Sequence, residues 1–352
     1  MRILSAVGAR PQFIKAGPIS KALKAHGIEE VLVHSGQHYD SNMSDLFFEE
    51  LGLPEPARNL GIGSGTHASQ TAAMLVGFED AILHYKPDWV LVHGDTNSTL
   101  AAALAATKLG VKVAHNEAGL RSFNRSMPEE YNRILTDHCS DLMFCPTQRA
   151  FAQLRKEGIA EGVHYVGDVM YDCLLNYQDV AAKRNGVMQA LGLEEKQFVL
   201  VTIHRAYNVD QTDRLECIIR ALANVKGPFV LPVHPRLKAK IEAFDIRFPS
   251  TVLMIEPIGY LDMLQLERSA RIVVTDSGGV QKEAYMFATP CVTLRPETEW
   301  METVEAGWNR ITDVNVERIR DALSSHWWPS SRPEIFGNGQ AAHSIADILK
   351  NS

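Results

Sequence analysis

The stretch "RIVVTDSGGVQKEA", residues 271–284, joins an apolar run to a helix-forming segment through two adjacent glycines. Its first part is typical of a strand that is buried on both faces of a parallel sheet. Ser277, Gly278 and Gly279 then lead into a helix, where their backbone N–H groups can point at phosphate oxygens. The stretch predicts one strand–turn–helix unit of a doubly wound α/β fold that binds a phosphate. A glycine-rich turn needed only for packing is the alternative.

The same alternation of strand and helix runs through the rest of the chain. Strands are expected at 2–7, 30–35, 88–94, 111–116, 142–146 and 164–167, and again at 198–204, 229–234, 252–257, 271–276 and 290–295. Helical patterns lie between them, and the alternation pauses between about 170 and 196. We therefore expect an α/β fold of two Rossmann-like domains that face a cleft, 1–169 and 170–336, with a C-terminal helix in 337–352 that packs back on the first domain.

The composition argues against several classes of protein. The chain has 352 residues and a formal net charge of -7, with no long run of Lys and Arg, which argues against a nucleic acid partner. No apolar stretch approaches the length of a transmembrane helix or suits a signal peptide, so we expect no membrane partner. The five cysteines lack C-x-x-C spacing, which indicates neither a metal site nor a disulfide framework and favours reduced thiols in a cytoplasmic protein.

Candidate site residues of the first half follow its expected strands, because open α/β sheets bind ligands at the carboxyl ends of their strands. Arg10 and Lys15 flank the start of a helix and predict an anion site, unless they are ordinary surface charges. Asp95, Glu117 and Glu129 are candidate acids. Asp95 could instead cap the next helix, and Glu129 could serve the positive end of its own helix. Glu117 resists such an explanation, because an acid beside a buried strand is costly unless it is paired.

Candidate site residues of the second half suit a diphosphate. His204 and Arg205 follow one expected central strand and His234 follows the next, an arrangement that favours phosphate binding over a structural role for each. Glu283 lies one or two turns into the helix after the glycines, within reach of a ribose diol. Arg295 ends the last expected strand. Anion-binding groups in the second half and carboxylates in the first indicate an enzyme that acts on a sugar nucleotide.

Taken together, the motifs resemble those of one family. They are "GARPQFIK", "GQH", "GDTNSTLA", "EAGLRS", "PEEYNR", "IHR", "DSGGVQKEA", "TEW" and "GNGQA", in the same order from about residue 3 to about residue 345. In this combination the chain resembles the non-hydrolysing UDP-N-acetylglucosamine 2-epimerases. The resemblance implies the glycosyltransferase-B architecture, a homodimer, a UDP-sugar substrate, and neither a cofactor nor a metal.

The resemblance also implies a reaction, the inversion of C2 of a UDP-linked 2-acetamido sugar. UDP leaves by anti elimination to give a 2-acetamidoglucal, and it adds back after protonation of the opposite face. Carboxylates stabilise the developing oxocarbenium charge and carry the C2 proton, while cations and N–H donors stabilise the departing diphosphate. Carried over by motif, the catalytic residues are Asp95, Glu117, Glu129 and His204. The substrate-binding residues are Arg10, Lys15, Gln37, His38, Arg205, His234, Ser277, Gly278, Gly279, Glu283 and Arg295.

The chain departs from the commonest family pattern in places. Gln12 stands where Glu is frequent, Met127 replaces a frequent Trp, and Tyr207 replaces a frequent Glu. The segments "GARPQFIKA" and "RSFNRSMPEE" look more like the branch that acts on UDP-2,3-diacetamido-2,3-dideoxyglucuronic acid for O-antigen synthesis. A uronate requires a further cation near C6, for which Arg121 and Arg125 are candidates. A glycosyltransferase of the same fold, a hydrolysing 2-epimerase and a non-catalytic binder are the alternative functions.

Overall fold

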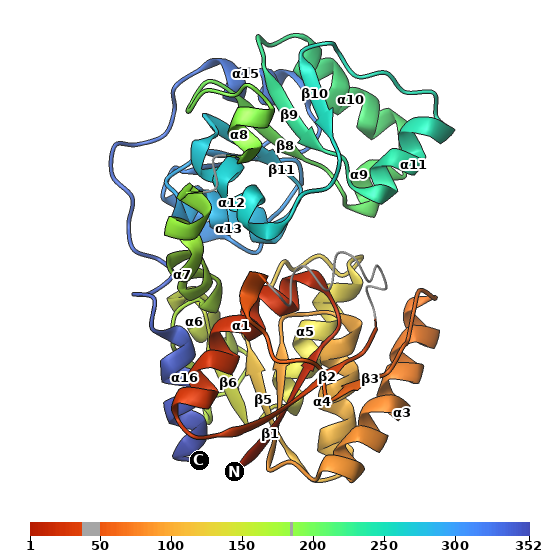
Figure 1. Cartoon of the computed structure of the whole chain (residues 1–352), viewed down its shortest axis with the longest axis vertical. Helices are drawn as coiled ribbons and strands as arrows, with labels where there is room; N and C mark the ends of the chain where they lie inside the picture. Colours follow the sequence, from red (N-terminus) through yellow and green to blue (C-terminus); the bar gives the residue numbers. More distant parts are fainter. Residues whose placement is uncertain (37–49, 184–185) are drawn as a thin grey trace. The chain divides into compact units, whose positions relative to one another are not determined.

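The computed structural model describes residues 1–36, 50–183 and 186–352, and these residues form two compact units (Figure 1). Unit 1 comprises Met1–Asn176 and Glu334–Ser352, and unit 2 comprises Tyr177–Pro333. Each unit contains one parallel sheet with helices packed on both faces. Each is therefore a Rossmann-like α/β unit of the predicted class.

Unit 1 is built around a seven-stranded sheet in the order β3-β2-β1-β4-β5-β6-β7. Its strands are β1 (Arg2–Val7), β2 (Glu29–His34), β3 (Arg58–Asn59), β4 (Trp89–His93), β5 (Lys112–Asn116), β6 (Leu142–Cys145) and β7 (Val163–Tyr165). The strand order reverses between β1 and β4. Such a switch point is where open parallel sheets bind ligands, at the carboxyl ends of the strands.

Helices cover both faces of this sheet. They are α1 (Arg10–Ala25), α3 (His67–Tyr85), α4 (Asn97–Lys108), α5 (Pro128–Cys139), α6 (Gln148–Lys156), α16 (Ala341–Lys350) and the start of α7 (Val169–Lys183). Along β4, Val90 and Val92 pack with α3 and α4, whereas Trp89 and Leu91 pack with α1 and α16. This burial on both faces explains why the strand is apolar from Trp89 to Val92.

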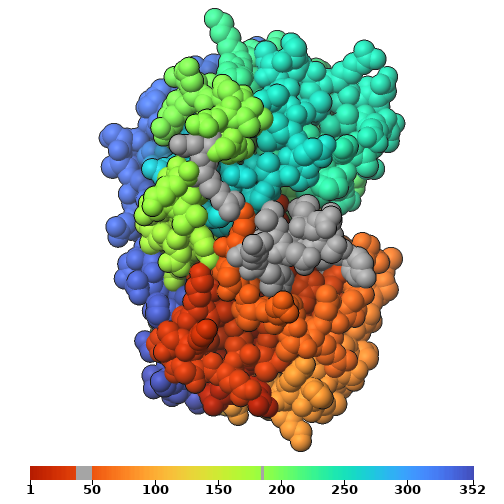
Figure 2. All heavy atoms as spheres, in the orientation of Figure 1, coloured from red at the N-terminus to blue at the C-terminus, as the bar shows by residue number. Residues whose placement is uncertain are grey.

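The C-terminal segment belongs to unit 1. Helix α16, drawn in blue, lies beside the red helix α1 (Figures 1 and 2). Ile345 is fully buried in the apolar cluster that also contains Ile19 of α1. The carboxylate of Asp172 accepts two backbone N–H groups from the first turn of α16 at 3.2 and 2.7 Å. The start of this helix is therefore capped by α7.

Unit 2 is built around a six-stranded sheet in the order β10-β9-β8-β11-β12-β13. Its strands are β8 (Val199–Thr202), β9 (Phe229–Pro232), β10 (Val252–Ile255), β11 (Ile272–Thr275), β12 (Cys291–Thr293) and β13 (Asn309–Ile311). Its helices are α8 (Gly186–Ala190), α9 (Ala206–Val209), α10 (Thr212–Ala223), α11 (Pro235–Ala243), α12 (Tyr260–Ser269), α13 (Gly278–Met286), α14 (Met301–Glu305) and α15 (Val316–Ser324). Helices α10 and α15 pack on one face, and α12 and α13 on the other. The switch point here lies between β8 and β11.

The eleven strands expected from the sequence are confirmed, and two more strands were missed. The missed strands are β3, at one edge of the unit 1 sheet, and β13, at one edge of the unit 2 sheet. They have only two and three residues. An edge strand pairs on one side only and is partly exposed, so it does not need an apolar run. Strands β3 (RN) and β13 (NRI) are both very short and mostly polar, so hydrophobic periodicity gives little signal for them.

We expect Ile345→Ala to lower the free energy of unfolding of unit 1 by about 2–4 kcal/mol, because it leaves a cavity under α16. Hydrogen exchange resolved by peptide measures this, since peptides of unit 1 should exchange faster while those of unit 2 stay unchanged. Lys350→Ala, at an exposed position of the same helix, should change the free energy of unfolding of unit 1 by less than about 0.5 kcal/mol. Equal effects of the two substitutions would contradict the packing of α16.

Candidate functional site

The carboxyl edge of the unit 1 sheet gathers four of the predicted residues. Arg10 and Lys15 lie on α1, directly after β1. Asp95 follows β4, and Glu117 follows β5. Strands β1, β4 and β5 are neighbours, and β4 pairs with β5 to the last residue of each strand. The two acids therefore emerge from the same edge of the sheet.

Asp95 is held by Arg133 of α5. One guanidinium nitrogen lies 2.5 Å from Asp95 Oδ2, and another lies 2.6 Å from Glu130 Oε2. The Arg133 side chain is only 4% exposed, whereas that of Asp95 is 33% exposed and remains accessible. The alternative role of Asp95 as a helix cap is wrong, because Thr96 caps α4 by accepting the N–H of Thr99. The Asp95 carboxylate is thus presented by a buried cation.

Glu117 is paired with Lys15 in a confined space. Lys15 Nζ lies 2.5 Å from Glu117 Oε1, and the two side chains are 8% and 10% exposed. Glu117 has a φ of 74°, an uncommon left-handed conformation for a residue other than glycine. A Cβ on Gly94 would lie 3.0 Å from Lys15 Nζ and 3.4 Å from Glu117 Oε1. The ion pair therefore lies against Gly94, the residue that precedes Asp95.

Gln12 ties the start of α1 to the end of β4. Its side-chain nitrogen donates to the His93 carbonyl and to Thr99 Oγ1, both at 3.0 Å, and its oxygen accepts the N–H of Ala9 at 3.0 Å. An ionised Glu could not donate the first of these hydrogen bonds. The surroundings of Gln12 therefore suit an amide rather than the Glu of the commonest family pattern. The hydrogen bonds of Gln12 hold in place the helix that carries Arg10 and Lys15.

Glu129 is half-buried in the first turn of α5, after Pro128 at the first helical position. Glu129, Arg133 and Asp137 follow one another at intervals of four residues, so they share one face of this helix. Sequence reasoning missed Arg133 and Asp137, although this spacing was available as a signal. Helix α5 thus brings a predicted acid to the same face as the cation that holds Asp95.

Arg121 is buried in unit 1 and paired with carboxylates there, so its predicted role as a ligand for a uronate is wrong. Its guanidinium contacts Glu157 through two hydrogen bonds of 2.8 and 2.6 Å and Asp137 through one of 2.6 Å. The side chain is only 2% exposed. Arg125, by contrast, is exposed. Arg125 therefore stays the candidate of the two.

Unit 2 carries the predicted phosphate site at the start of α13. Ser277 caps this helix, because its hydroxyl accepts the N–H of Val280 at 3.4 Å. The first N–H groups of a helix have no partner within it, which suits the half-buried Gly278 and Gly279 to anion binding. A Cβ on Gly278 would meet Trp300 Nε1 at 3.5 Å and Glu299 Oε2 at 3.8 Å. A side chain here would therefore fill the space in front of the helix.

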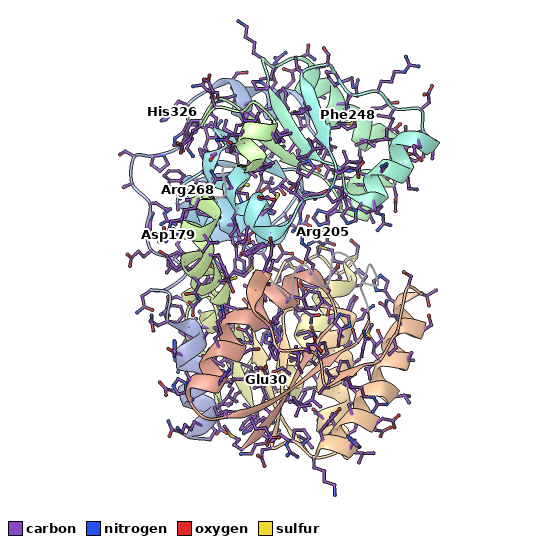
Figure 3. The ribbon with its side chains drawn as sticks, viewed as in Figure 1. Glu30, Asp179, Arg205, Phe248, Arg268 and His326 are labelled. Atoms are coloured by element: carbon purple, nitrogen blue, oxygen red, sulfur yellow. The ribbon has the colours of Figure 1, made fainter. Side chains whose placement is uncertain are left out.

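His204 and Arg205 lie on the loop after β8, and Figure 3 labels Arg205. The buried Asp276 organises this loop by accepting both backbone N–H groups at 3.1 Å, and its carboxylate lies 3.2 Å from His204 Nδ1. Burial alone would raise the pKa of Asp276, but the His204 ring and the surrounding donors hold it below its ordinary value. Sequence reasoning quoted Asp276 without giving it a role. Because Nδ1 of His204 faces the Asp276 carboxylate, Nε2 of the same ring points away from that carboxylate.

His234 lies next to His204, with 5.7 Å between the ring centroids. Its Nδ1 accepts the N–H of Arg236 at 3.2 Å and so caps α11. A ring that accepts at Nδ1 carries its proton on Nε2 when neutral. His234 therefore combines the structural role considered for it with an N–H donor on its other nitrogen.

The remaining predicted residues of unit 2, Glu283 and Arg295, are almost completely buried. Glu283 is 4% exposed on α13. Arg295 is 3% exposed and forms two hydrogen bonds of 2.9 Å with Glu299. Arg295 is therefore engaged by a carboxylate of its own unit.

Gln37 and His38 lie outside the residues that the structure describes.

Two kinds of feature are absent from the described parts of the chain. No group of three or more His, Cys, Asp and Glu side chains there is arranged to hold a metal ion. Within the same residues, no helix combines the length and the apolar character needed to cross a membrane.

Comparisons with known proteins agree with the site chemistry. The family model described as UDP-N-acetylglucosamine 2-epimerase matches residues 21–350. This chain belongs to that family. It is 48% identical over 358 residues to a UDP-N-acetylglucosamine 2-epimerase homolog of Methanococcus maripaludis, with 100% of both chains covered. It is also 48% identical to the UDP-2,3-diacetamido-2,3-dideoxy-D-glucuronate 2-epimerase of Pseudomonas aeruginosa, with 99% of each chain covered.

The family is also evident in three dimensions. The crystal structure of the Methanocaldococcus jannaschii UDP-GlcNAc 2-epimerase in complex with UDP-GlcNAc and UDP matches with a TM-score of 0.93 at 42% identity, and both chains are covered completely. This similarity confirms the predicted glycosyltransferase-B-like α/β fold. Because 2-epimerases are isomerases, the predicted enzyme class is confirmed as well.

His93 is a fully buried histidine of this 2-epimerase, at the end of β4. Its Nδ1 accepts a hydrogen bond from the Asn116 side chain at 3.3 Å, so the neutral ring carries its proton on Nε2. Burial, followed by the nearby positive charge of Lys15, lowers the pKa of His93 to about 3. The ring is therefore neutral in the folded protein over the whole physiological range of pH.

Below about pH 6.5 an unfolded histidine takes up a proton that the folded His93 does not, so the free energy of unfolding falls as the pH falls. We expect a loss of about 2 kcal/mol between about pH 7.5 and about pH 5 from this group alone. His93→Gln lacks this proton linkage. Urea denaturation should therefore show that the free energies of unfolding of wild type and variant differ by an amount that changes across this pH range. A difference that stays constant with pH would contradict a buried neutral ring.

Proposed function

We propose that this enzyme inverts C2 of a UDP-linked 2-acetamido sugar by anti elimination of UDP and its re-addition. The observation that carries the proposal is the pair of acids, Asp95 and Glu117, that emerge from neighbouring strands and are each held by a cation. Membership of the 2-epimerase family and the M. jannaschii relative, solved with UDP-GlcNAc and UDP, support the same reaction.

The elimination breaks two bonds of the sugar. The C1–O bond breaks first and its electron pair leaves with the diphosphate, which gives the ring oxocarbenium character. A carboxylate then takes the proton from C2, and the electron pair of the C–H bond forms the C1–C2 double bond of the 2-acetamidoglucal. Asp95, Glu117 and Glu129 supply the negative charge and the proton acceptor. Return of a proton to the opposite face of C2 and re-addition of UDP give the epimer without any net oxidation.

Unit 2 supplies the groups that accept the departing diphosphate. The N–H groups of Gly278 and Gly279 lie at the positive end of α13, and His234 offers an Nε2–H donor. Arg205 adds a positive charge. His204, whose Nδ1 faces Asp276, can deliver a proton from Nε2 to a diphosphate oxygen. Stabilising the leaving group in this way lowers the barrier to cleavage of the C1–O bond.

Two sugars fit this proposal. UDP-N-acetylglucosamine is the substrate that most relatives are named for, and the diacetamido uronate is the substrate named for the P. aeruginosa relative. The exposed Arg125, between Glu117 and Glu129 in the sequence, favours the second because it could meet the C6 carboxylate. The uronate would connect the enzyme to O-antigen synthesis.

The deciding experiment incubates the wild-type enzyme in heavy water with each of the two UDP-sugars and follows the products by NMR. We expect a second epimer that carries deuterium at C2, because the abstracted proton exchanges with the solvent. Free sugar in amounts equal to UDP would favour a hydrolysing 2-epimerase, and sugar transfer to an acceptor would favour a glycosyltransferase. No deuterium and no epimer with either substrate would reject the proposal.

We expect Glu117→Gln to lower kcat by about 100- to 1,000-fold, because the amide neither carries a negative charge nor accepts the C2 proton. UDP binding, measured by calorimetry, should stay within about twofold, since unit 2 supplies the diphosphate contacts. Glu161→Gln, at an exposed position of unit 1, is the control and should leave kcat unchanged. Normal turnover by Glu117→Gln would exclude Glu117 from the chemistry.

We also propose that the enzyme is a cytoplasmic homodimer that associates through α3. Val76 and Leu83 on this helix are 58% and 57% exposed, and Tyr131 on α5 is 48% exposed. A groove of about 450 Å³ lies between α3 and α5. Its lining combines apolar residues with polar ones, namely Ala68, Ala72, Leu75, Pro128 and Tyr131 with His67, Thr71, Asn97 and Asn132. Exposed apolar patches of this kind are typical of protein–protein interfaces. None of the five cysteines, all within the described residues, forms a disulfide, which supports a reducing compartment.

Val76→Arg combined with Leu83→Arg should convert the dimer to a monomer, because each places a charge in an apolar contact. Sedimentation equilibrium measures the mass. Leu253→Arg, at an exposed position of β10 in unit 2, is the matched control and should stay dimeric. A dimer that survives both α3 substitutions would place the interface elsewhere.

A further inference from the structure

His115, on β5, lies between two hydrogen-bond acceptors in the interior of unit 1. Its Nδ1 lies 2.7 Å from Asp137 Oδ1, and its Nε2 lies 2.7 Å from the carbonyl oxygen of Gly94. The histidine and aspartate side chains are both completely buried. A carbonyl and an ionised carboxylate only accept hydrogen bonds, so both ring nitrogens must donate. We propose that His115 is a buried imidazolium that positions the catalytic turn Gly94–Asp95.

The other partners of Asp137 show that the proton resides on the ring. Arg121 donates to Asp137 Oδ2 at 2.6 Å, and the N–H of Gly119 approaches the same carboxylate at 3.2 Å. A carboxylate surrounded by donors is stabilised in its ionised form. Although burial raises it, the pKa of Asp137 is held below its ordinary value by His115 and Arg121. An alternative with a protonated Asp137 and a neutral ring would oppose all of these contacts.

The charges around His115 balance only if the ring is positive. Arg121 forms two hydrogen bonds with Glu157 and one with Asp137, so one guanidinium faces two carboxylates. Asp137 is completely buried, whereas Glu157 is 23% exposed, so the imidazolium supplies a positive charge that pairs with the buried carboxylate. Of the other titratable groups nearby, Cys145 is buried and burial raises the pKa of its thiol, which leaves it neutral. His93 on the neighbouring strand is also neutral, because burial lowers its pKa.

The Nε2–H of His115 acts on the turn that carries Asp95. It fixes the peptide of Gly94, against which the Lys15–Glu117 ion pair lies. Asp95 is the next residue. Neither nitrogen of His115 is left for a ligand, so it is a positioning residue rather than a catalytic one. Its charge thereby connects α5, through Asp137, to the turn after β4.

The protonation state is tested on the wild-type protein by NMR with ¹⁵N in the histidine rings. We expect both nitrogens of His115 to carry protons at about pH 7, whereas His93 should carry a proton on Nε2 only. The His115→Gln spectrum identifies the signals. An unprotonated ring nitrogen in His115 at this pH would overturn the inference. This experiment needs no turnover, so it stands even if the proposed function fails.

The positioning role rests on the proposed function and is tested by kinetics. His115→Gln should lower kcat about 100-fold, because the turn shifts, while KM and UDP affinity change by less than about twofold. Val113→Ala, on the same strand in the apolar cluster that contains Met74 and Phe78, is the control because it destabilises unit 1 without touching the turn. Its kcat should equal that of wild type. Equal losses of kcat in the two variants, or a normal kcat in His115→Gln, would overturn the role.

Discussion

The site of unit 1 depends on the burial of Arg133 between two carboxylates. This guanidinium lies within 2.6 Å of both Asp95 and Glu130 and is almost completely excluded from water. A buried cation of this kind is stable only when its charge is paired. The planar group, with its fixed fork of donors, therefore determines where the Asp95 carboxylate can lie. Lysine, a point charge on a flexible stem, would not impose the same geometry.

Glu130 extends this arrangement to the loop that follows Glu117. Its carboxylate accepts the backbone N–H groups of Ser122 and Phe123 at 2.9 and 2.8 Å. Phe123 has a φ of 58° and a 74% exposed side chain, and Glu117 also has a positive φ. Such conformations cost about 1–3 kcal/mol each and persist only where the surroundings impose them. Glu130 supplies that constraint at Phe123, where the loop is held in a shape that its own sequence disfavours.

Unit 2 uses the same principle with the charges exchanged. There a buried carboxylate, Asp276, accepts hydrogen bonds from the loop that carries His204 and Arg205. The basic groups intended for an anion are thus ordered by a fixed negative charge, while the acids of unit 1 are ordered by fixed positive charges. In both units the residues proposed to bind the substrate are organised by oppositely charged partners at the carboxyl ends of parallel strands. Pre-organised charges of this kind require little rearrangement when charge develops during the reaction.

The sequence by itself determined the fold class, eleven of the strands and the positions of Asp95, Glu117 and His204 at strand ends. It could do so because alternation of strands and helices permits few topologies, and because a parallel sheet brings all its carboxyl ends to one edge. Only the tertiary structure decided which charges pair. Arg121 was expected to meet a ligand but is buried against Asp137 and Glu157, since a side chain pairs with groups that are near in space. Strands β3 and β13, the cap at Thr96 and the charge on His115 likewise depend on neighbours that are distant or ambiguous in the sequence.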